Sequence, residues 1–261
     1  MKQRIITGVV GGIGFLFLIY LGSAWYSLLV LSLAIVGLYE FLRMAKLQSF
    51  VPAGILAYVL MLSIVWPSLA FTAWVDIGTP DLMLPVFFLL LIYSVLRKNQ
   101  FHIEHIALTI VGALYIGYGF TYMAAARNLP DGLMMTILVF LGIWSTDSGA
   151  YFIGKAIGRH KLWPEISPNK TTEGAVGGLF TSLVIVLVVN MLFGGIPTSQ
   201  ALLIALVTGI MGQLGDLVES AFKRHYGVKD SGQIIPGHGG VLDRFDSMIL
   251  VFPVLHLLGI V

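Results

Sequence analysis

The chain has 261 residues, of which 57% are hydrophobic and 11% charged, and its mean hydropathy is +0.93. Long apolar runs at this hydropathy exclude a soluble globular core and predict a polytopic helical membrane protein. The net charge of +2 fits cytoplasm-facing loops and not a nucleic-acid surface, and the lack of cysteine excludes disulfides, thiolate metal sites and cysteine nucleophiles.

Transmembrane helices need roughly 20 apolar residues each. Pro67 and Pro85 interrupt two of the candidates, and residues 68–75 either extend the third span or lie at the membrane interface. The first apolar run lacks a small-x-small cleavage site and is interpreted as a retained span. We expect an all-α polytopic membrane protein with about nine transmembrane helices, near residues 5–22, 24–42, 51–67, 82–96, 105–125, 132–152, 174–193, 199–217 and 246–261.

Basic residues are distributed unevenly between the predicted loops. With the N-terminus in the cytoplasm, Arg127 alone of the 15 Lys and Arg residues lies outside. The opposite loops carry Asp76, Asp81, Asp131 and an uncharged turn over 194–200. This asymmetry follows the positive-inside rule, and an odd number of spans then places the C-terminus outside.

Candidate chemistry is concentrated after residue 130. Residues 1–130 are predicted to form N-terminal transmembrane helices that act as a scaffold, a dimer surface or a lipid-facing layer. Residues 131–261 are predicted to form a C-terminal catalytic transmembrane region with long cytoplasmic loops over 153–173 and 218–245.

In the first half, Glu40 precedes Arg43 by three residues near a helix end. A local ion pair between them is favoured over a catalytic role for Glu40.

The run SAFKRHYGVKDSGQIIPGHGGVLDRFD, Ser220 to Asp246, combines cations, carboxylates and glycines between apolar segments. These are the materials for holding a polyphosphate through metal ions at a membrane surface. If the preceding helix continues into this run, Asp216, Glu219, Ser220 and Lys223 share one helical face. A salt-bridged helix end, in which Lys223 neutralises Glu219, is the alternative to a functional face.

Asp243 and Asp246 are spaced i, i+3 at the start of the last predicted span. Helix capping explains either carboxylate alone. Mg²⁺ takes a few carboxylate oxygens and completes its shell with substrate phosphates, so Asp216, Asp243 and Asp246 are candidate ligands if the run folds back. The glycines around His238 either bind phosphate through backbone N–H groups or form a simple turn, and His238 is a phosphate donor or only a loop residue.

The other long loop follows Asp147, which lies in an apolar segment with Tyr151 and Gly154 on its helical face. An intramembrane carboxylate is a functional candidate, although small neighbours also suit helix packing around a hydrogen-bonded Asp147. Arg159 and Lys161 are interpreted as positive-inside charges, whereas Lys155 is either such a charge or part of the site. SPNKTTEG, residues 167–174, is typical of a turn with Thr171 or Thr172 as helix cap, and Lys170 within it contacts either phosphate or water.

Both loops together resemble the phosphatidate cytidylyltransferases (CDP-diacylglycerol synthases). The family signature runs Ser-x-apolar-Lys-Arg, four residues, Lys-Asp-x-small, then Pro-x-His-Gly-Gly-apolar-x-Asp-Arg-apolar-Asp. The upstream runs DSGAY from Asp147 and SPNKT from Ser167 are similar to that family as well, and the resemblance covers residues 140–261 closely. Every fixed position of the signature is filled here, by Ser220, Lys223, Arg224, Lys229, Asp230, Gly232, Pro236, His238, Gly239, Gly240, Asp243, Arg244 and Asp246.

The resemblance implies an all-helical, usually dimeric enzyme of the bacterial inner membrane that makes CDP-diacylglycerol and pyrophosphate from CTP and phosphatidic acid. It implies Mg²⁺ and a second cation, K⁺ or Mg²⁺, and it makes Asp216, Asp243 and Asp246 the candidate metal ligands. Lys223 and Arg224 would bind phosphate at a site on the cytoplasmic side. The implied substrate-binding residues are Asp147, Lys170, Ser220, Lys229, His238, Gly239, Gly240 and Arg244.

Such a reaction suits the residues present, because screening two polyanions needs cations and fixed geometry but no side-chain nucleophile. Another membrane phosphotransferase would use similar Asp–Mg²⁺ chemistry, but the DG-x-x-AR and DDxxD motifs are absent. A transporter is the other alternative, although its repeats and broken helices would occupy both halves of the chain.

Overall fold

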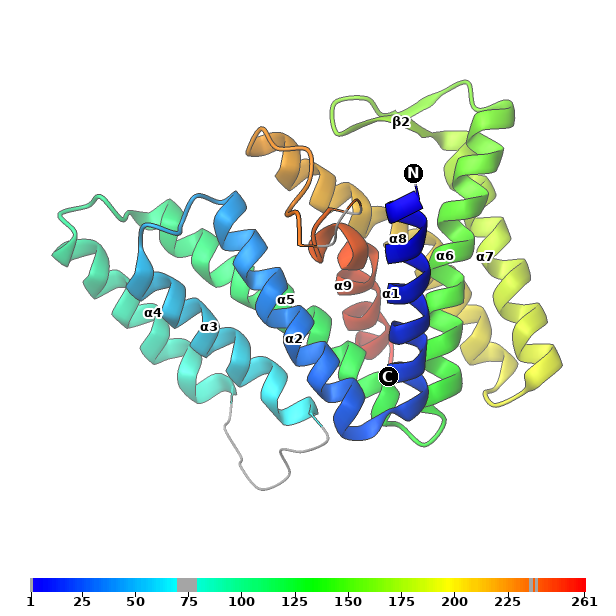
Figure 1. Ribbon diagram of the computed structural model, residues 1–261, viewed down its shortest axis with the longest axis horizontal. Coiled ribbons are helices and arrows are strands. Elements are labelled where there is room, and N and C mark those ends of the chain that lie inside the picture. The colour runs from blue at the N-terminus through cyan, green and yellow to red at the C-terminus, as the bar shows by residue number, and fades with distance from the viewer. Residues whose placement is uncertain (1, 70–78, 235–236, 238) are drawn as a thin grey trace. The chain divides into compact units, whose positions relative to one another are not determined.

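The computed structural model describes residues 2–69, 79–234, 237 and 239–261 (Figure 1). Within this part of the chain, each of the nine predicted apolar segments overlaps an α-helix, and a 3₁₀ turn, η1 (Trp66–Ser68), follows the third helix. The helices are α1 (Lys2–Leu21), α2 (Ser23–Met44), α3 (Val51–Val65), α4 (Thr79–Leu96), α5 (Ile103–Asn128), α6 (Gly132–Ile157), α7 (Thr172–Phe193), α8 (Thr198–His225) and α9 (Leu242–Leu257).

Six helical segments among the described residues are long and apolar enough to cross a membrane: α2, α3 with η1, α5, α6, α7 and α8. Shorter apolar stretches occupy Gly8–Leu21 of α1 and Leu82–Leu96 of α4. The structure therefore confirms a helical membrane protein. A total of nine spans and the side of the N-terminus stay predictions.

The chain forms two compact units. The first contains the residues up to Ala125 together with Asp230–Leu242, and the second contains Ala126–Lys229 together with Asp243–Val261. The signature run therefore contributes to both units: it begins in the second, passes through the first, and returns to the second at Asp243.

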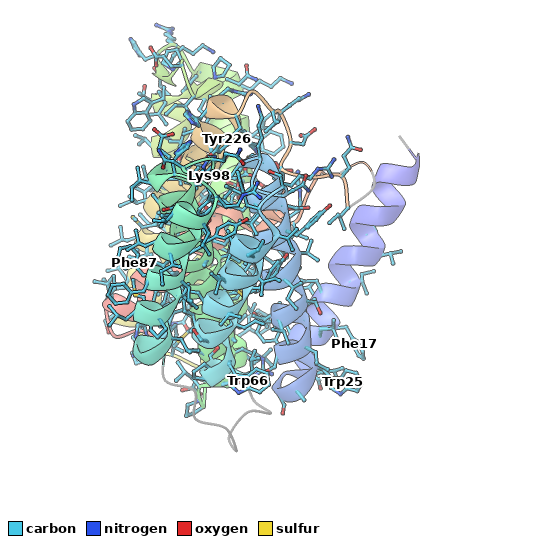
Figure 2. All side chains as sticks on the ribbon, turned by 90° about the vertical axis from the view of Figure 1, so that its left-hand side faces the viewer. Phe17, Trp25, Trp66, Phe87, Lys98 and Tyr226 are labelled. Carbon is cyan, nitrogen blue, oxygen red and sulfur yellow. The ribbon has the colours of Figure 1, made fainter. Side chains whose placement is uncertain are left out.

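In the first unit, α2, α3 and α5 share a core of buried apolar side chains that includes Leu38, Ile64 and Phe120. Thr121 on α5 donates a hydrogen bond from Oγ1 to the carbonyl of Ile64, at 2.9 Å. Figure 2 shows Trp25 and Trp66 at one end of this unit and Lys98 at the opposite end. An aromatic end and a basic end are the arrangement expected of helices that cross a bilayer.

In the second unit, small residues let α6, α7 and α8 approach closely. A Cβ at Gly178 of α7 would lie 2.6 Å from the carbonyl oxygen of Thr146 on α6, and one at Gly209 of α8 would lie 3.1 Å from Cα of Leu179 on α7. The face of α7 that these contacts leave uncovered is apolar, with Phe180 and Met191 exposed by 66% and 87%. Close packing on one side and apolar exposure on the other fit a helix that faces lipid.

A two-stranded antiparallel hairpin, β1 (Lys161–Trp163) and β2 (Ser167–Thr171), precedes α7 and was not predicted. Figure 1 shows the hairpin beyond the C-terminal end of α6 and the start of α7. Its strands are too short to show an alternating pattern in the sequence. Thr171 is the N-cap of α7, because its Oγ1 accepts a hydrogen bond from the N–H of Gly174 at 3.1 Å. The cap predicted at Thr171 or Thr172 is therefore confirmed at Thr171.

Candidate active site

A cavity of about 470 Å³ opens in the second unit between α6, the hairpin, the start of α7, and α8. Its α6 wall is one helical face that includes Asp147, Tyr151 and Gly154, as the sequence spacing predicts. The cavity volume lies within the range of about 300–1,000 Å³ that is usual for small-molecule sites. The remaining lining residues are Ala150, Lys155, Gly158, Lys161, Asn169, Lys170, Thr171, Gly174, Ala175, Gln213 and Asp216.

An ion pair crosses one side of this cavity. Nζ of Lys170, on β2, lies 2.7 Å from Oδ2 of Asp216, on α8. Both side chains remain partly accessible, at 25% and 34% exposure. Two predicted site residues, one from the hairpin and one from α8, are thus brought together beside the open space of the cavity.

Helix α8 continues eight residues past its predicted end, to His225, so the polar face predicted from Asp216 to Lys223 exists. Ser220 donates a hydrogen bond from Oγ to Oδ1 of Asp216, at 3.1 Å. Lys223 pairs with Oε2 of Glu219 at 2.5 Å and with Oδ1 of Asp243 at 2.7 Å. The ion pair between Lys223 and Glu219 is confirmed, and it extends to the first carboxylate of α9.

Glu219 is 1% exposed, and its Oε1 has no hydrogen-bond partner among the described atoms. Lys223 therefore compensates a buried negative charge, and two of its three N–H donors are directed at carboxylates. The sequence placed Glu219 on one helical face with Asp216 and Lys223, as part of a functional face or of a salt-bridged helix end, without predicting its burial. Its burial arises from packing that the sequence pattern does not show.

A close helix crossing brings Asp246 to the same region. A Cβ on Gly215 of α8 would lie 2.6 Å from the carbonyl oxygen of Asp246 and 2.8 Å from Cα of Ser247, so only glycine allows this approach. Asp246 is in electrostatic range of Asp147, Asp216 and Lys223. The carboxylates of α6, α8 and α9 therefore converge within the second unit, as the sequence interpretation requires for Asp216 and Asp246.

Several other predicted site residues do not line the cavity. Arg224 is exposed and donates from Nε to the carbonyl of Ile166, at 3.3 Å, which ties the hairpin turn to the end of α8. Arg244 is exposed and in electrostatic range of Asp147, whereas Lys229 is exposed after the end of α8. Gly239 and Gly240 belong to the first unit, and His238 lies outside the described residues.

Lys155, Lys161, Asn169 and Gln213 are among the cavity residues that were not assigned to the site from the sequence. Lys161 was interpreted as a positive-inside charge, whereas Lys155 was left open between that role and the site, and it follows Asp147 by eight residues on the same helical face. Asn169 precedes Lys170 on β2. Gln213 donates from Nε2 to the carbonyls of Ala175 and Gly209, at 3.0 and 2.6 Å, and so links α8 to α7.

No group of three acidic or histidine side chains among the described residues is arranged to hold a metal ion by itself. The donors nevertheless fit Mg²⁺ in kind. Carboxylate oxygens of Asp147, Asp216 and Asp246 repel one another around a shared region. A hard divalent cation that completes its shell with water and substrate phosphates relieves that repulsion.

These features define a helical membrane protein with a charged cavity suited to phosphate groups. The chain belongs to the cytidylyltransferase family, whose sequence model matches residues 2–261. The match extends through the first half, where the sequence resemblance rested only on hydrophobic character.

Among its relatives, the phosphatidate cytidylyltransferase of Bacillus subtilis (strain 168) is 46% identical over 99% of this chain and 97% of its own length. The phosphatidate cytidylyltransferase of Staphylococcus haemolyticus is 42% identical over 99% of this chain and 98% of its own. That of Staphylococcus aureus (strain COL) is 41% identical with the same coverage.

Proposed function

We propose that this chain transfers the CMP unit of CTP to phosphatidic acid, giving CDP-diacylglycerol and pyrophosphate. A phosphate oxygen of phosphatidic acid attacks the α-phosphorus of CTP, and the bond from that phosphorus to the bridging oxygen of the β-phosphate breaks. Membership in the cytidylyltransferase family and the names of full-length relatives support the reaction. The cavity that joins Asp147, Lys170 and Asp216 is the observation that carries the assignment to this region.

The cationic side chains of the cavity suit a nucleoside triphosphate. Lys155, Lys161 and Lys170 all line it, and Lys170 is held by Asp216 at 2.7 Å. Both substrates are polyanions, so these ammonium groups lower the repulsion between them. The pair with Asp216 holds Lys170 at one place, which favours a fixed orientation of the phosphate chain.

Asp216, Asp243 and Asp246 are the proposed Mg²⁺ ligands, and Asp147 is a further candidate because it lies in electrostatic range of Asp216. Bound Mg²⁺ would supply charge neutralisation for the triphosphate and the leaving pyrophosphate. Lys223 acts beside this set by neutralising Glu219 and Asp243. Asp243 thus divides its carboxylate between an ion pair and any metal ion, and the second cation, K⁺ or Mg²⁺, is proposed to occupy the same region.

The proposed location is the bacterial inner membrane with the active site toward the cytoplasm. Phosphatidic acid is held in the bilayer by its acyl chains and CTP is dissolved in the cytoplasm, so the site must open to both. The basic residues around the cavity agree with a cytoplasmic side under the positive-inside rule. We further propose that the chain has nine spans and a cytoplasmic N-terminus and that it forms a homodimer.

The test is pyrophosphate release by purified protein in mixed micelles of detergent and phosphatidic acid. We expect turnover of CTP that requires both phosphatidic acid and Mg²⁺ and that stops on chelation with EDTA. Diacylglycerol, which lacks the attacking phosphate, serves as the control acceptor and should give no product. If CTP stays intact under all these conditions and the protein instead moves a solute into vesicles, the enzyme proposal is wrong and the chain is a transporter.

A pair of variants tests the acidic set. Asp216→Asn and Asp246→Asn should each lower turnover by at least about 10²-fold, because a neutral amide weakens both cation binding and charge complementarity. Asp131→Asn is the matched control: Asp131 is exposed in the same unit and its side chain makes no capping hydrogen bond. Equal turnover by all three variants would show that the carboxylates of Asp216 and Asp246 take no part in the reaction.

A further inference from the structure

Glu40, near the end of α2, is 1% exposed although it is a charged residue in an apolar helix. Its carboxylate oxygens accept hydrogen bonds from residues far away in the sequence. Oε1 accepts from the backbone N–H of Val241 at 3.0 Å, and Oε2 accepts from the backbone N–H of Leu242 at 3.0 Å and from Oγ of Ser231 at 3.2 Å. All these residues belong to the first unit.

The backbone at Gly232 and at Gly240 lies close against this carboxylate. A Cβ added at Gly232 or at Gly240 would lie closer than 3.0 Å to side-chain atoms of Glu40. Both positions carry glycine because the carboxylate occupies the space that a side chain would need. The segment from Ser231 to Leu242 (the glycine loop) is therefore held at both of its ends by one residue.

A second contact on the same face of α2 supports this arrangement. Gly37 lies one turn before Glu40, and a Cβ there would lie 3.3 Å from Cδ2 of Leu242. The small residue leaves room for the Leu242 side chain, which is 1% exposed. Leu242 is thus fixed to α2 through both its backbone and its side chain.

We propose that Glu40 is a positioning residue for the cytidylyltransferase reaction: its carboxylate closes the glycine loop and fixes the backbone at Leu242, directly before Asp243. The inference rests on the proposed function and adds a residue from the first half of the chain, outside the signature run. Asp243 follows Leu242 in the chain and pairs with Lys223 at 2.7 Å. Only one planar peptide unit separates Leu242 from Asp243, so a displacement of the Leu242 backbone moves the main chain that carries the Asp243 carboxylate.

The contacts of the Glu40 carboxylate differ from the local ion pair with Arg43 that the sequence favours. Arg43 is exposed in the last turn of α2, whereas Glu40 is buried with its oxygens directed at the glycine loop. Substituting each residue separately therefore distinguishes the two roles. Glu40→Gln places an amide N–H₂ opposite a backbone N–H donor, which breaks at least one bond while the shape of the side chain is kept.

The experiment compares Glu40→Gln with Arg43→Gln by steady-state kinetics and by hydrogen exchange of the purified full chain. For Glu40→Gln we expect kcat to fall about 10- to 100-fold with KM for CTP nearly unchanged, because the reacting groups are misplaced and not removed. The amides of Val241 and Leu242 should exchange on the order of tenfold faster. Arg43→Gln should match the parent chain in both measurements.

Glu40→Asp, which keeps the charge but shortens the reach, should recover part of kcat and of the exchange protection. If Glu40→Gln fails to fold, Gly240→Ala disturbs the same contact from the loop side and should give the same pair of changes. Unchanged kcat and exchange in Glu40→Gln, or an equal defect in Arg43→Gln, would overturn the proposal. Failure of the parent chain to turn over CTP would instead refute the proposed function. Hydrogen exchange at the amides of Val241 and Leu242 would still show whether Glu40 holds the glycine loop.

Discussion

Gly215 controls how closely α8 and α9 approach, and its substitution by alanine is a direct test of the site geometry. The added Cβ would lie 2.6 Å from the carbonyl oxygen of Asp246 and 2.8 Å from Cα of Ser247. Both are backbone atoms, so no side-chain rotation relieves the contact. Ordinary van der Waals contact begins near 3.4 Å, and α9 must therefore move away by about 0.8 Å.

Two opposing terms set the stability of Gly215→Ala. Overpacking costs about 1–3 kcal/mol, whereas replacing glycine by alanine inside a helix stabilises it by about 1 kcal/mol. We expect a net loss of about 1 kcal/mol in the free energy of unfolding. The effect on catalysis should be larger, because a displacement near 1 Å between reacting groups costs about 10²-fold in rate.

Gly212→Ala is the matched control, one turn earlier on α8. Its Cβ would meet its nearest atom, Cγ1 of Ile143, at 3.8 Å, which is an ordinary contact. This variant should keep parental turnover and gain up to about 1 kcal/mol from helix propensity. Thermal unfolding in detergent and CTP turnover with phosphatidic acid measure both effects. Equal turnover of Gly215→Ala and Gly212→Ala would show that the α8–α9 crossing does not set the geometry of the carboxylates.

Two further predictions concern single contacts, and a third concerns the topology of the chain in the membrane. Thr171→Ala should lower the free energy of unfolding by about 1 kcal/mol through loss of the α7 cap, measured by thermal unfolding, whereas Thr172→Ala should change it by only a few tenths. Lys170→Met should raise KM for CTP about 10- to 150-fold, because one charge-assisted contact to phosphate is worth about 1.5–3 kcal/mol; an unchanged KM would place the triphosphate elsewhere. Because the chain has no cysteine, Ser49→Cys and Ser199→Cys test topology: a membrane-impermeant maleimide should label Ser199→Cys in intact cells and Ser49→Cys only after permeabilisation.

The apolar segments could be located from the sequence because helix length and hydropathy are local properties. A bilayer requires every backbone polar group to be paired within the segment, so a long apolar run has few alternatives to a helix. The same local reasoning located Thr171 as one of two candidate caps and placed Asp147 on one face with Tyr151 and Gly154. It failed at β1 and β2, whose few residues carry no periodic signal.

The sequence also determined which residues are candidates for chemistry, because charges are costly in an apolar chain and their clusters stand out. Their partners were decided only by tertiary structure. Glu40 meets Leu242 across 202 positions, and Lys170 meets Asp216 across the cavity. Such pairs depend on how distant helices pack, and no local pattern records them; the sequence therefore named the charged groups, and the fold chose which of them face one another.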